Sequence, residues 1–212
     1  FKGTNAAPKL LTVPGIDNSG PRHWQTLWED DLDDCERVDL GMWDRPHRNT
    51  WVNKLNAAIA AARRPVVLIA HSLGCHVVAW WNHLEREAEG KVLGALLVAP
   101  PNLIDIPTTS RLAAFAPLVR ERLRFPAVLA ASRDDHYASF GQSRKMARAW
   151  GCHFVDAGWI GHINVDSNIG AWPFGRYLLD RLMFNLQQPQ SRFAAATAGD
   201  RGRNTQLRMS LY

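Results

Sequence analysis

Residues 65–74 read P-V-V-L-I-A-H-S-L-G and decide the fold class. The first six are continuously apolar or proline, which is typical of a strand buried on both faces of a sheet. Residues 73–87 have a helical pattern, so Ser72 lies where a strand runs directly into a helix. Ala70 and Gly74, two residues to either side, are small enough for the tight turn of a nucleophile elbow, although Ala70 stands where this motif usually has glycine. The alternative is a purely structural role, in which Ser72 only caps the helix.

The rest of the chain alternates strand and helix patterns around this stretch. Such alternation indicates βαβ units and a parallel sheet with helices on both faces. We predict an α/β fold of about six mostly parallel strands, in one domain that covers residues 1–186. The further strands are expected at 9–13, 36–40, 92–99, 127–131 and 153–157, and the further helices at 21–33, 51–62, 139–150 and 172–186.

The loops that follow the later strands hold the partners that a nucleophilic serine needs. Ligands of such sheets bind outside the carboxyl ends of the strands, and a serine nucleophile needs a base and an orienting carboxylate. Asp134 and Asp135 follow the strand at 127–131, and His162 follows the strand at 153–157. The order Ser, Asp, His is that of α/β-hydrolases. We predict a triad of Ser72, Asp135 and His162, with Asp134 as the alternative acid.

The oxyanion hole is expected to use two backbone N–H groups. One is that of Leu73, at the start of the helix after Ser72. The other comes from the loop after the first strand, where Gly15 permits unusual backbone turns. We predict the Ile16 N–H, with that of Asp17 as the alternative.

Four stretches resemble the small serine hydrolases related to retinoblastoma-binding protein 9, a compact branch of the α/β-hydrolases. They are V-P-G-I-D-N-S-G-P-R-H-W-Q-T-L-W-E from residue 13, A-H-S-L-G from residue 70, S-R-D-D-H-Y from residue 132 and G-H-I-N from residue 161. The resemblance covers residues 8–186 and implies a compact α/β-hydrolase fold, hydrolase activity and Ser72, Asp135 and His162 as the triad. The acid loop of that family usually continues D-D-P, whereas His136 stands here in place of the proline.

Two side chains in these loops are candidates for the substrate pocket. His136 lies in the acid loop, and Trp159 comes three residues before His162. Residues 100–126 hold five prolines with apolar residues between them, and segment 102–123 within this stretch is expected to form a small apolar cap.

Composition narrows the class of protein further. The 212 residues carry a net charge of +5, and residues 187–212 supply three of these charges. We interpret that segment as a flexible basic tail. The body shows no basic run, so we expect no nucleic acid as a partner. No apolar run is long enough to span a membrane, and no secretory signal is recognisable.

The cysteines and the absence of ligand motifs complete the prediction. Three cysteines at irregular spacings suggest a reducing compartment, so we expect a cytoplasmic protein. We expect neither a cofactor nor a metal. The predicted function is hydrolysis of a small carboxylic ester through an acyl-enzyme. The alternatives are a protein-binding module on a hydrolase scaffold and an amidase or peptidase, and a protein partner or a homodimer stays open.

Overall fold

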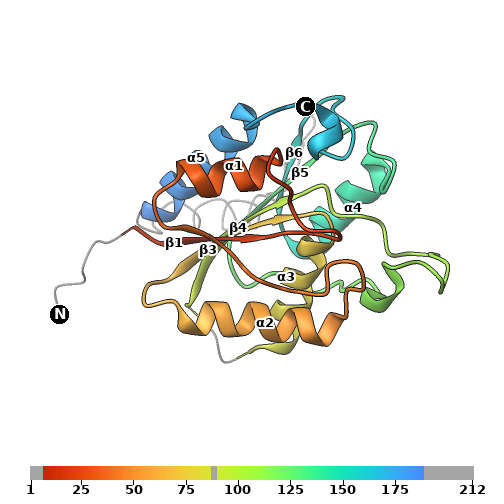
Figure 1. Cartoon of the computed structure of the whole chain (residues 1–212), viewed down its shortest axis with the longest axis horizontal. Helices are drawn as coiled ribbons and strands as arrows, with labels where there is room; N and C mark the ends of the chain where they lie inside the picture. Colours follow the sequence, from red (N-terminus) through yellow and green to blue (C-terminus); the bar gives the residue numbers. More distant parts are fainter. Residues whose placement is uncertain (1–6, 87–89, 189–212) are drawn as a thin grey trace, which may run out of the picture.

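A single parallel sheet forms the centre of the molecule (Figure 1). The computed structural model describes residues 7–86 and 90–188. Six strands are paired in the order β2-β1-β3-β4-β5-β6, all in parallel. This confirms the predicted α/β class. The strands are β1 (Lys9–Val13), β2 (Cys35–Arg37), β3 (Val66–His71), β4 (Val92–Val98), β5 (Ala127–Ala131) and β6 (His153–Asp156).

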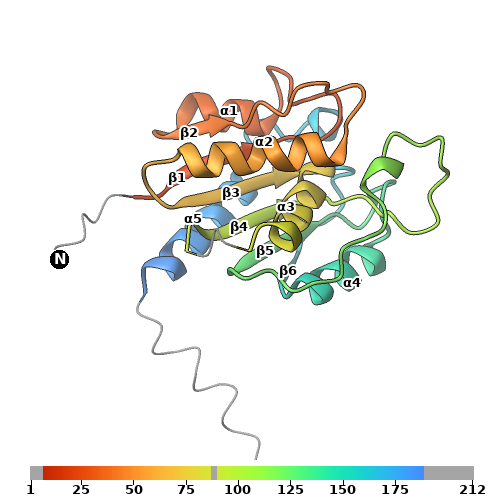
Figure 2. The same cartoon turned by 90° about the horizontal axis from the view of Figure 1, so that it is seen from below.

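Helices cover both faces of this sheet, as Figures 1 and 2 show. All six residues of β3 are buried, because alternate side chains enter two separate cores. Leu68 and Ala70 face one core with α2 (Arg48–Ala61), α3 (Leu73–Leu84) and α4 (Phe140–Trp150). Val67 and Ile69 face the other core with α1 (Trp24–Asp31) and α5 (Pro173–Gln187).

Several element boundaries differ from the prediction. The helix expected over 21–33 begins at Trp24, because the Nδ1 atom of His23 accepts the Gln25 N–H and caps the helix there. The strand expected over 36–40 is β2, Cys35–Arg37. Beyond its end, the Val38 N–H still donates to the Thr12 carbonyl of β1 at 3.0 Å, but the Leu40 N–H donates locally to the Val38 carbonyl. The helix expected to reach residue 87 ends at Leu84. From residue 189 onward, the predicted basic tail lies outside the described residues.

Segment 102–123 contains one short 3-10 helix, η1 (Ala113–Phe115), and otherwise has irregular structure. Figure 2 shows it as a green loop that projects from the body beside α4 and α3. Phe115, Val119 and Leu123 are buried in the core shared with α2 and α3. The segment is therefore packed on the domain at its C-terminal half, and its role as a cap stays a prediction.

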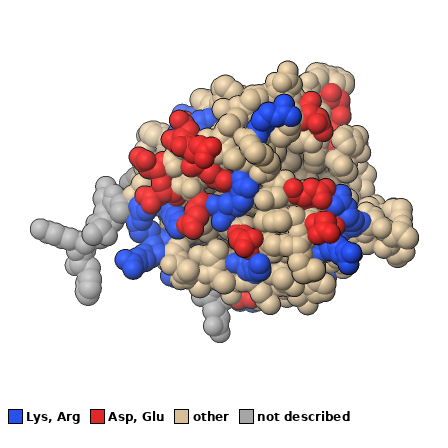
Figure 3. Space-filling model, viewed as in Figure 1, with Lys and Arg blue, Asp and Glu red and all other residues tan. Residues whose placement is uncertain are grey.

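The surface visible in Figure 3 carries interspersed charges, with Lys and Arg next to Asp and Glu. None of the helices within residues 7–86 and 90–188 combines the length and the apolar character that a membrane-spanning helix needs.

Candidate active site

The junction of β3 and α3 holds Ser72 in a strained backbone conformation. Its φ is 53° and its ψ is −126°, in the region that residues with a side chain rarely adopt. Two glycines make room for the turn. A Cβ atom on Gly74 would lie 2.1 Å from the Val13 carbonyl oxygen, and one on Gly15 would lie 2.8 Å from the Ser72 Cβ. The loop after β1 therefore lies directly against Ser72, and larger residues would not fit at either glycine.

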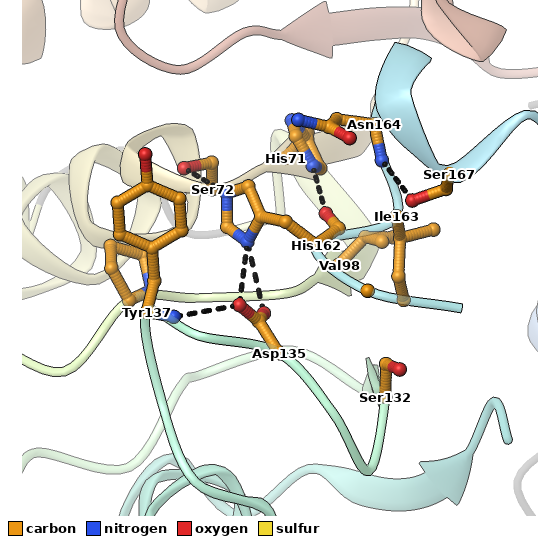
Figure 4. A network of polar contacts seen from close by, with 12 residues as sticks. His71, Ser72, Val98, Ser132, Asp135, Tyr137, His162, Ile163, Asn164 and Ser167 are labelled. Carbon is orange, nitrogen blue, oxygen red and sulfur yellow. Dashed lines mark hydrogen bonds and ion pairs between the residues drawn. The ribbon is translucent and has the colours of Figure 1, made fainter. Parts of the chain in front are cut away.

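Three side chains from separate loops meet at this turn, as Figure 4 shows. The His162 Nε2 atom lies 2.9 Å from the Ser72 Oγ atom. The His162 Nδ1 atom lies 3.0 and 2.9 Å from the two carboxylate oxygens of Asp135. Asp135 and His162 are buried, and Ser72 is half-buried. The geometry thus joins the three residues that the sequence singled out in one continuous hydrogen-bonded chain.

The neighbouring carboxylate, Asp134, points elsewhere. It is exposed, and it accepts hydrogen bonds from the Ser132 hydroxyl at 2.6 Å and from the Gly161 N–H at 2.9 Å. The Ser132 hydroxyl and that N–H hold the pKa of Asp134 below its usual range. Asp134 therefore ties the acid loop to the loop of His162, whereas Asp135 contacts the imidazole itself.

The two predicted oxyanion donors belong to the residue after Ser72 and to the loop after β1, which lies against Ser72. Leu73 is the first residue of α3, where N–H groups have no partner within the helix. The Asp17 N–H already donates to the Trp43 carbonyl at 3.0 Å, which removes the alternative donor. The Ile16 N–H has no hydrogen-bond partner within the described part of the chain. The prediction of Leu73 and Ile16 is therefore compatible with this geometry.

The loop after β1 is also tied to segment 102–123. Arg111 forms a two-pronged ion pair with the Asp17 carboxylate, at 2.7 and 2.9 Å. The hydrogen bond from the Arg111 guanidinium is the main reason why the pKa of Asp17 is lowered. Both side chains are exposed, so the pair contributes little to stability.

Aromatic side chains surround one side of the imidazole. The His136 ring centroid lies 6.0 Å from that of His162, and the Tyr137 centroid lies at 4.4 Å. The Tyr137 N–H also donates to the Asp135 Oδ1 atom at 2.9 Å. Trp159 is 70% exposed, and no ring contact or hydrogen bond joins it to Ser72, Asp135 or His162 within the described residues.

Three contributors to this region were not predicted from the sequence. Tyr137 follows His136 in the acid loop, and only its position after a strand could have suggested a role. The Ser132 hydroxyl, which also accepts the Ile160 N–H at 2.9 Å, bridges two loops. Trp24 reaches the loop of His162 from α1, and nothing in the spacing of residues indicates that contact.

One cavity of the described structure lies in segment 102–123, apart from these residues. This cavity of about 380 Å³ is lined by segment 102–123 alone, including Leu103, Ile106 and Pro117, and by none of the predicted site residues. Among the described residues, no three His, Cys, Asp or Glu side chains are grouped as metal ligands would be.

Comparison with solved structures relates the fold to known hydrolases. A protein described as a YdeN-like hydrolase from Pectobacterium atrosepticum is 27% identical, with a TM-score of 0.75 over 85% of this chain and 92% of its own. The ydeN gene product of Bacillus subtilis is 20% identical, with a TM-score of 0.68 over 84% of this chain and 100% of its own. Est1E from Butyrivibrio proteoclasticus is 11% identical, with a TM-score of 0.61 over 85% and 90%. The sheet and these likenesses together give a compact α/β-hydrolase fold.

Comparison with families and curated proteins gives the wider assignment. No curated protein matches the chain. The sequence model of the serine hydrolase family matches residues 10–181, which include the Ser72 turn, the acid loop and His162. The chain therefore belongs to the serine hydrolase family, and it is a hydrolase.

Proposed function

We propose that the protein hydrolyses small carboxylic esters through an acyl-enzyme on Ser72. The observation that supports this most strongly is the continuous contact from the Asp135 carboxylate through His162 to the Ser72 hydroxyl, with both imidazole contacts at about 2.9 Å. A residue that only capped α3 would need neither neighbour, and the Ser72 side chain makes no capping hydrogen bond to the helix. Within the serine hydrolases, we assign the chain to the retinoblastoma-binding protein 9 type on the basis of its N-S-G-P-R-H-W-Q stretch.

In the first step, the Ser72 Oγ atom attacks the ester carbonyl carbon, and its proton passes to the His162 Nε2 atom. Asp135 accepts the Nδ1–H of His162, which keeps Nε2 free to take that proton. The N–H groups of Leu73 and Ile16 stabilise the oxyanion of the tetrahedral intermediate. When the carbon–oxygen bond breaks, the imidazolium gives its proton to the leaving alcohol and an acyl-Ser72 ester remains.

In the second step, His162 removes a proton from water, which attacks the acyl carbon. The second tetrahedral intermediate collapses, the acid product leaves, and the Ser72 oxygen takes back the proton. His136, Tyr137 and Trp159 are proposed as walls of the substrate pocket. Segment 102–123 is proposed as the cap, since Arg111 joins it to the loop that carries Ile16.

The cysteines bear on where this activity occurs. Cys35, Cys75 and Cys152 are all free thiols, which fits the proposed cytoplasmic location. A protein-binding module on the same scaffold is the second candidate, but binding alone gives no reason for three polar side chains to be aligned in this way.

The test is a comparison of p-nitrophenyl esters with acyl chains of increasing length, together with the matched p-nitroanilides. We expect ester turnover by the wild type and a loss of about 10³-fold or more in kcat in Ser72→Ala. Faster cleavage of the anilides would shift the proposal to an amidase. Wild-type turnover that survives in Ser72→Ala would refute the mechanism.

A further inference from the structure

The indole groups of α1 reach across to the loop that carries His162. The Trp24 Nε1–H donates to the Ile163 carbonyl at 2.9 Å, and the Trp28 Nε1–H donates to the Ala171 carbonyl at 2.6 Å. Both rings are almost fully buried. One helix therefore holds the chain directly after His162 and again just before α5.

A third buried ring, that of His71, reaches the same loop from the end of β3. The His71 Nε2 atom lies 3.0 Å from the His162 carbonyl oxygen (Figure 4). A carbonyl only accepts hydrogen bonds, so this nitrogen of His71 carries the proton. Burial holds the pKa of His71 well below its usual value, so the ring is neutral and donates from Nε2 at neutral pH.

Ile163, which lies between the hydrogen bonds made by His71 and Trp24, has an unfavourable backbone conformation. Ile163 has a φ of 51°, which is unfavourable for a β-branched side chain, and its side chain is fully buried. Such a residue persists only when its surroundings fix its conformation. The carbonyls of His162 and Ile163 belong to the peptide planes on either side of the Ile163 Cα atom. Each of the two planes thus receives one ring N–H.

The two donor rings support each other. The Trp24 and His71 ring centroids are 5.9 Å apart with an edge-to-face angle of 88°. Trp24 also packs against Trp28 at 4.7 Å and against Trp172 at 5.3 Å. Because these rings are buried among one another, neither donor can turn away without opening the core between α1 and α5.

We propose that Trp24 and His71 are positioning residues, which fix the peptide planes around Ile163 and so set the reach of His162 to Ser72. The inference rests on the proposed function, and it gives Trp24 of the N-S-G-P-R-H-W-Q stretch and His71 of the A-H-S-L-G stretch a role in placing His162. A displacement of about 1 Å between reacting groups can cost about 10²-fold in rate. Both side chains are buried, so we expect neither to contact the substrate, and their loss should lower kcat and leave KM nearly unchanged.

The test compares Trp24→Phe with Trp81→Phe. Both changes keep an aromatic ring at a buried position and remove one indole hydrogen bond. The Trp81 Nε1–H donates to the Asn56 Oδ1 atom at 3.0 Å, between α2 and α3 and far from the loop of His162. His71→Leu removes the other donor without altering α1, and it serves if Trp24→Phe does not fold. Urea unfolding of each variant measures the stability that was lost.

Two readouts are needed, hydrogen–deuterium exchange over residues 160–171 and the kinetics of p-nitrophenyl acetate hydrolysis. We expect Trp24→Phe and His71→Leu to exchange faster in this region and to lose about 10- to 100-fold in kcat with KM unchanged. We expect Trp81→Phe to match the wild type in both, at a similar cost in stability.

The outcomes separate this inference from the proposed function. Exchange and kcat like those of Trp81→Phe would overturn the inference, and so would faster exchange without any loss of kcat. If the wild type itself hydrolyses no ester, the proposed function fails. The exchange data then still decide whether the two rings hold the loop.

Discussion

Replacement of Asp135 by Asn tests the assignment of the triad acid most sharply. The Tyr137 N–H donates to the Asp135 Oδ1 atom at 2.9 Å, so that position must remain an acceptor. In Asp135→Asn the amide oxygen therefore takes the Oδ1 place. The NH₂ group takes the Oδ2 place, which lies 2.9 Å from the His162 Nδ1 atom, while the Oδ1 place lies 3.0 Å from it.

That exchange replaces the acceptor at the Oδ2 place by a donor. The amide oxygen at 3.0 Å from Nδ1 is already shared with the Tyr137 N–H, so the NH₂ group at 2.9 Å favours an Nδ1 atom that carries no proton. Facing a donor, Nδ1 loses its proton, and the neutral ring then carries its proton on Nε2, which faces Ser72 at 2.9 Å. The ring in this tautomer cannot accept the serine proton. The same tautomer change in a well-studied serine protease lowers kcat by about 10⁴-fold, which corresponds to about 5 kcal/mol of transition-state stabilisation. We expect a loss of this size.

The assay is the initial rate of p-nitrophenyl acetate hydrolysis, with the spontaneous rate subtracted and the fold checked by urea unfolding. Asp134→Asn is the matched control, since its amide oxygen can still accept the Gly161 N–H. We expect this control to lose no more than about tenfold, the equivalent of about 1.4 kcal/mol. An equal loss in both variants, or near-normal turnover in Asp135→Asn, would refute the reasoning.

Three further predictions concern packing, pH and the thiols. Gly74→Ala should destabilise the fold by about 3 kcal/mol or more in urea unfolding, since its Cβ would lie 2.1 Å from the Val13 carbonyl oxygen; an unchanged midpoint would contradict this. Burial lowers the pKa of His76 from 6.5 to about 4, so only the unfolded chain gains this proton between those pH values. The contribution of His76 to the free energy of unfolding is therefore complete above pH 6.5 and falls by roughly 3 kcal/mol towards pH 4. Equal free energies of unfolding in urea titrations at pH 7 and pH 4 would contradict this prediction. Burial raises the pKa of Cys35 and Cys152 to about 12, so a disulfide reagent at pH 8 should label them far more slowly in the native protein than in urea; equal rates would be inconsistent with this burial.

Much of the fold could be predicted from the sequence because the apolar patterns of the buried strands are unambiguous. Residues 127–131 are predicted and observed as the same strand, since an apolar run buried on both faces has a clear pattern. Helix starts were less predictable. α1 begins after His23, whose ring acts as a cap, and histidine is not among the usual capping residues.

The site was predictable in outline because parallel strands bring their carboxyl ends to one edge. That rule placed Ser72, the Asp134–Asp135 pair and His162 in neighbouring loops. It did not distinguish the two aspartates, because that choice depends on the hydrogen bonds of Asp134 to Ser132 and Gly161. Nor did it reveal the Trp24 contact, which joins α1 to a loop 139 residues away in sequence.

The most direct test of the central claim is the adduct mass of the purified protein after treatment with a fluorophosphonate probe, compared with Ser72→Ala. An activated serine displaces fluoride and keeps the phosphonyl group, so mass spectrometry counts the modified sites. We predict one adduct on the wild type and none on Ser72→Ala. An unlabelled wild type, or an adduct that persists in Ser72→Ala, would contradict the claim that Ser72 is an activated nucleophile.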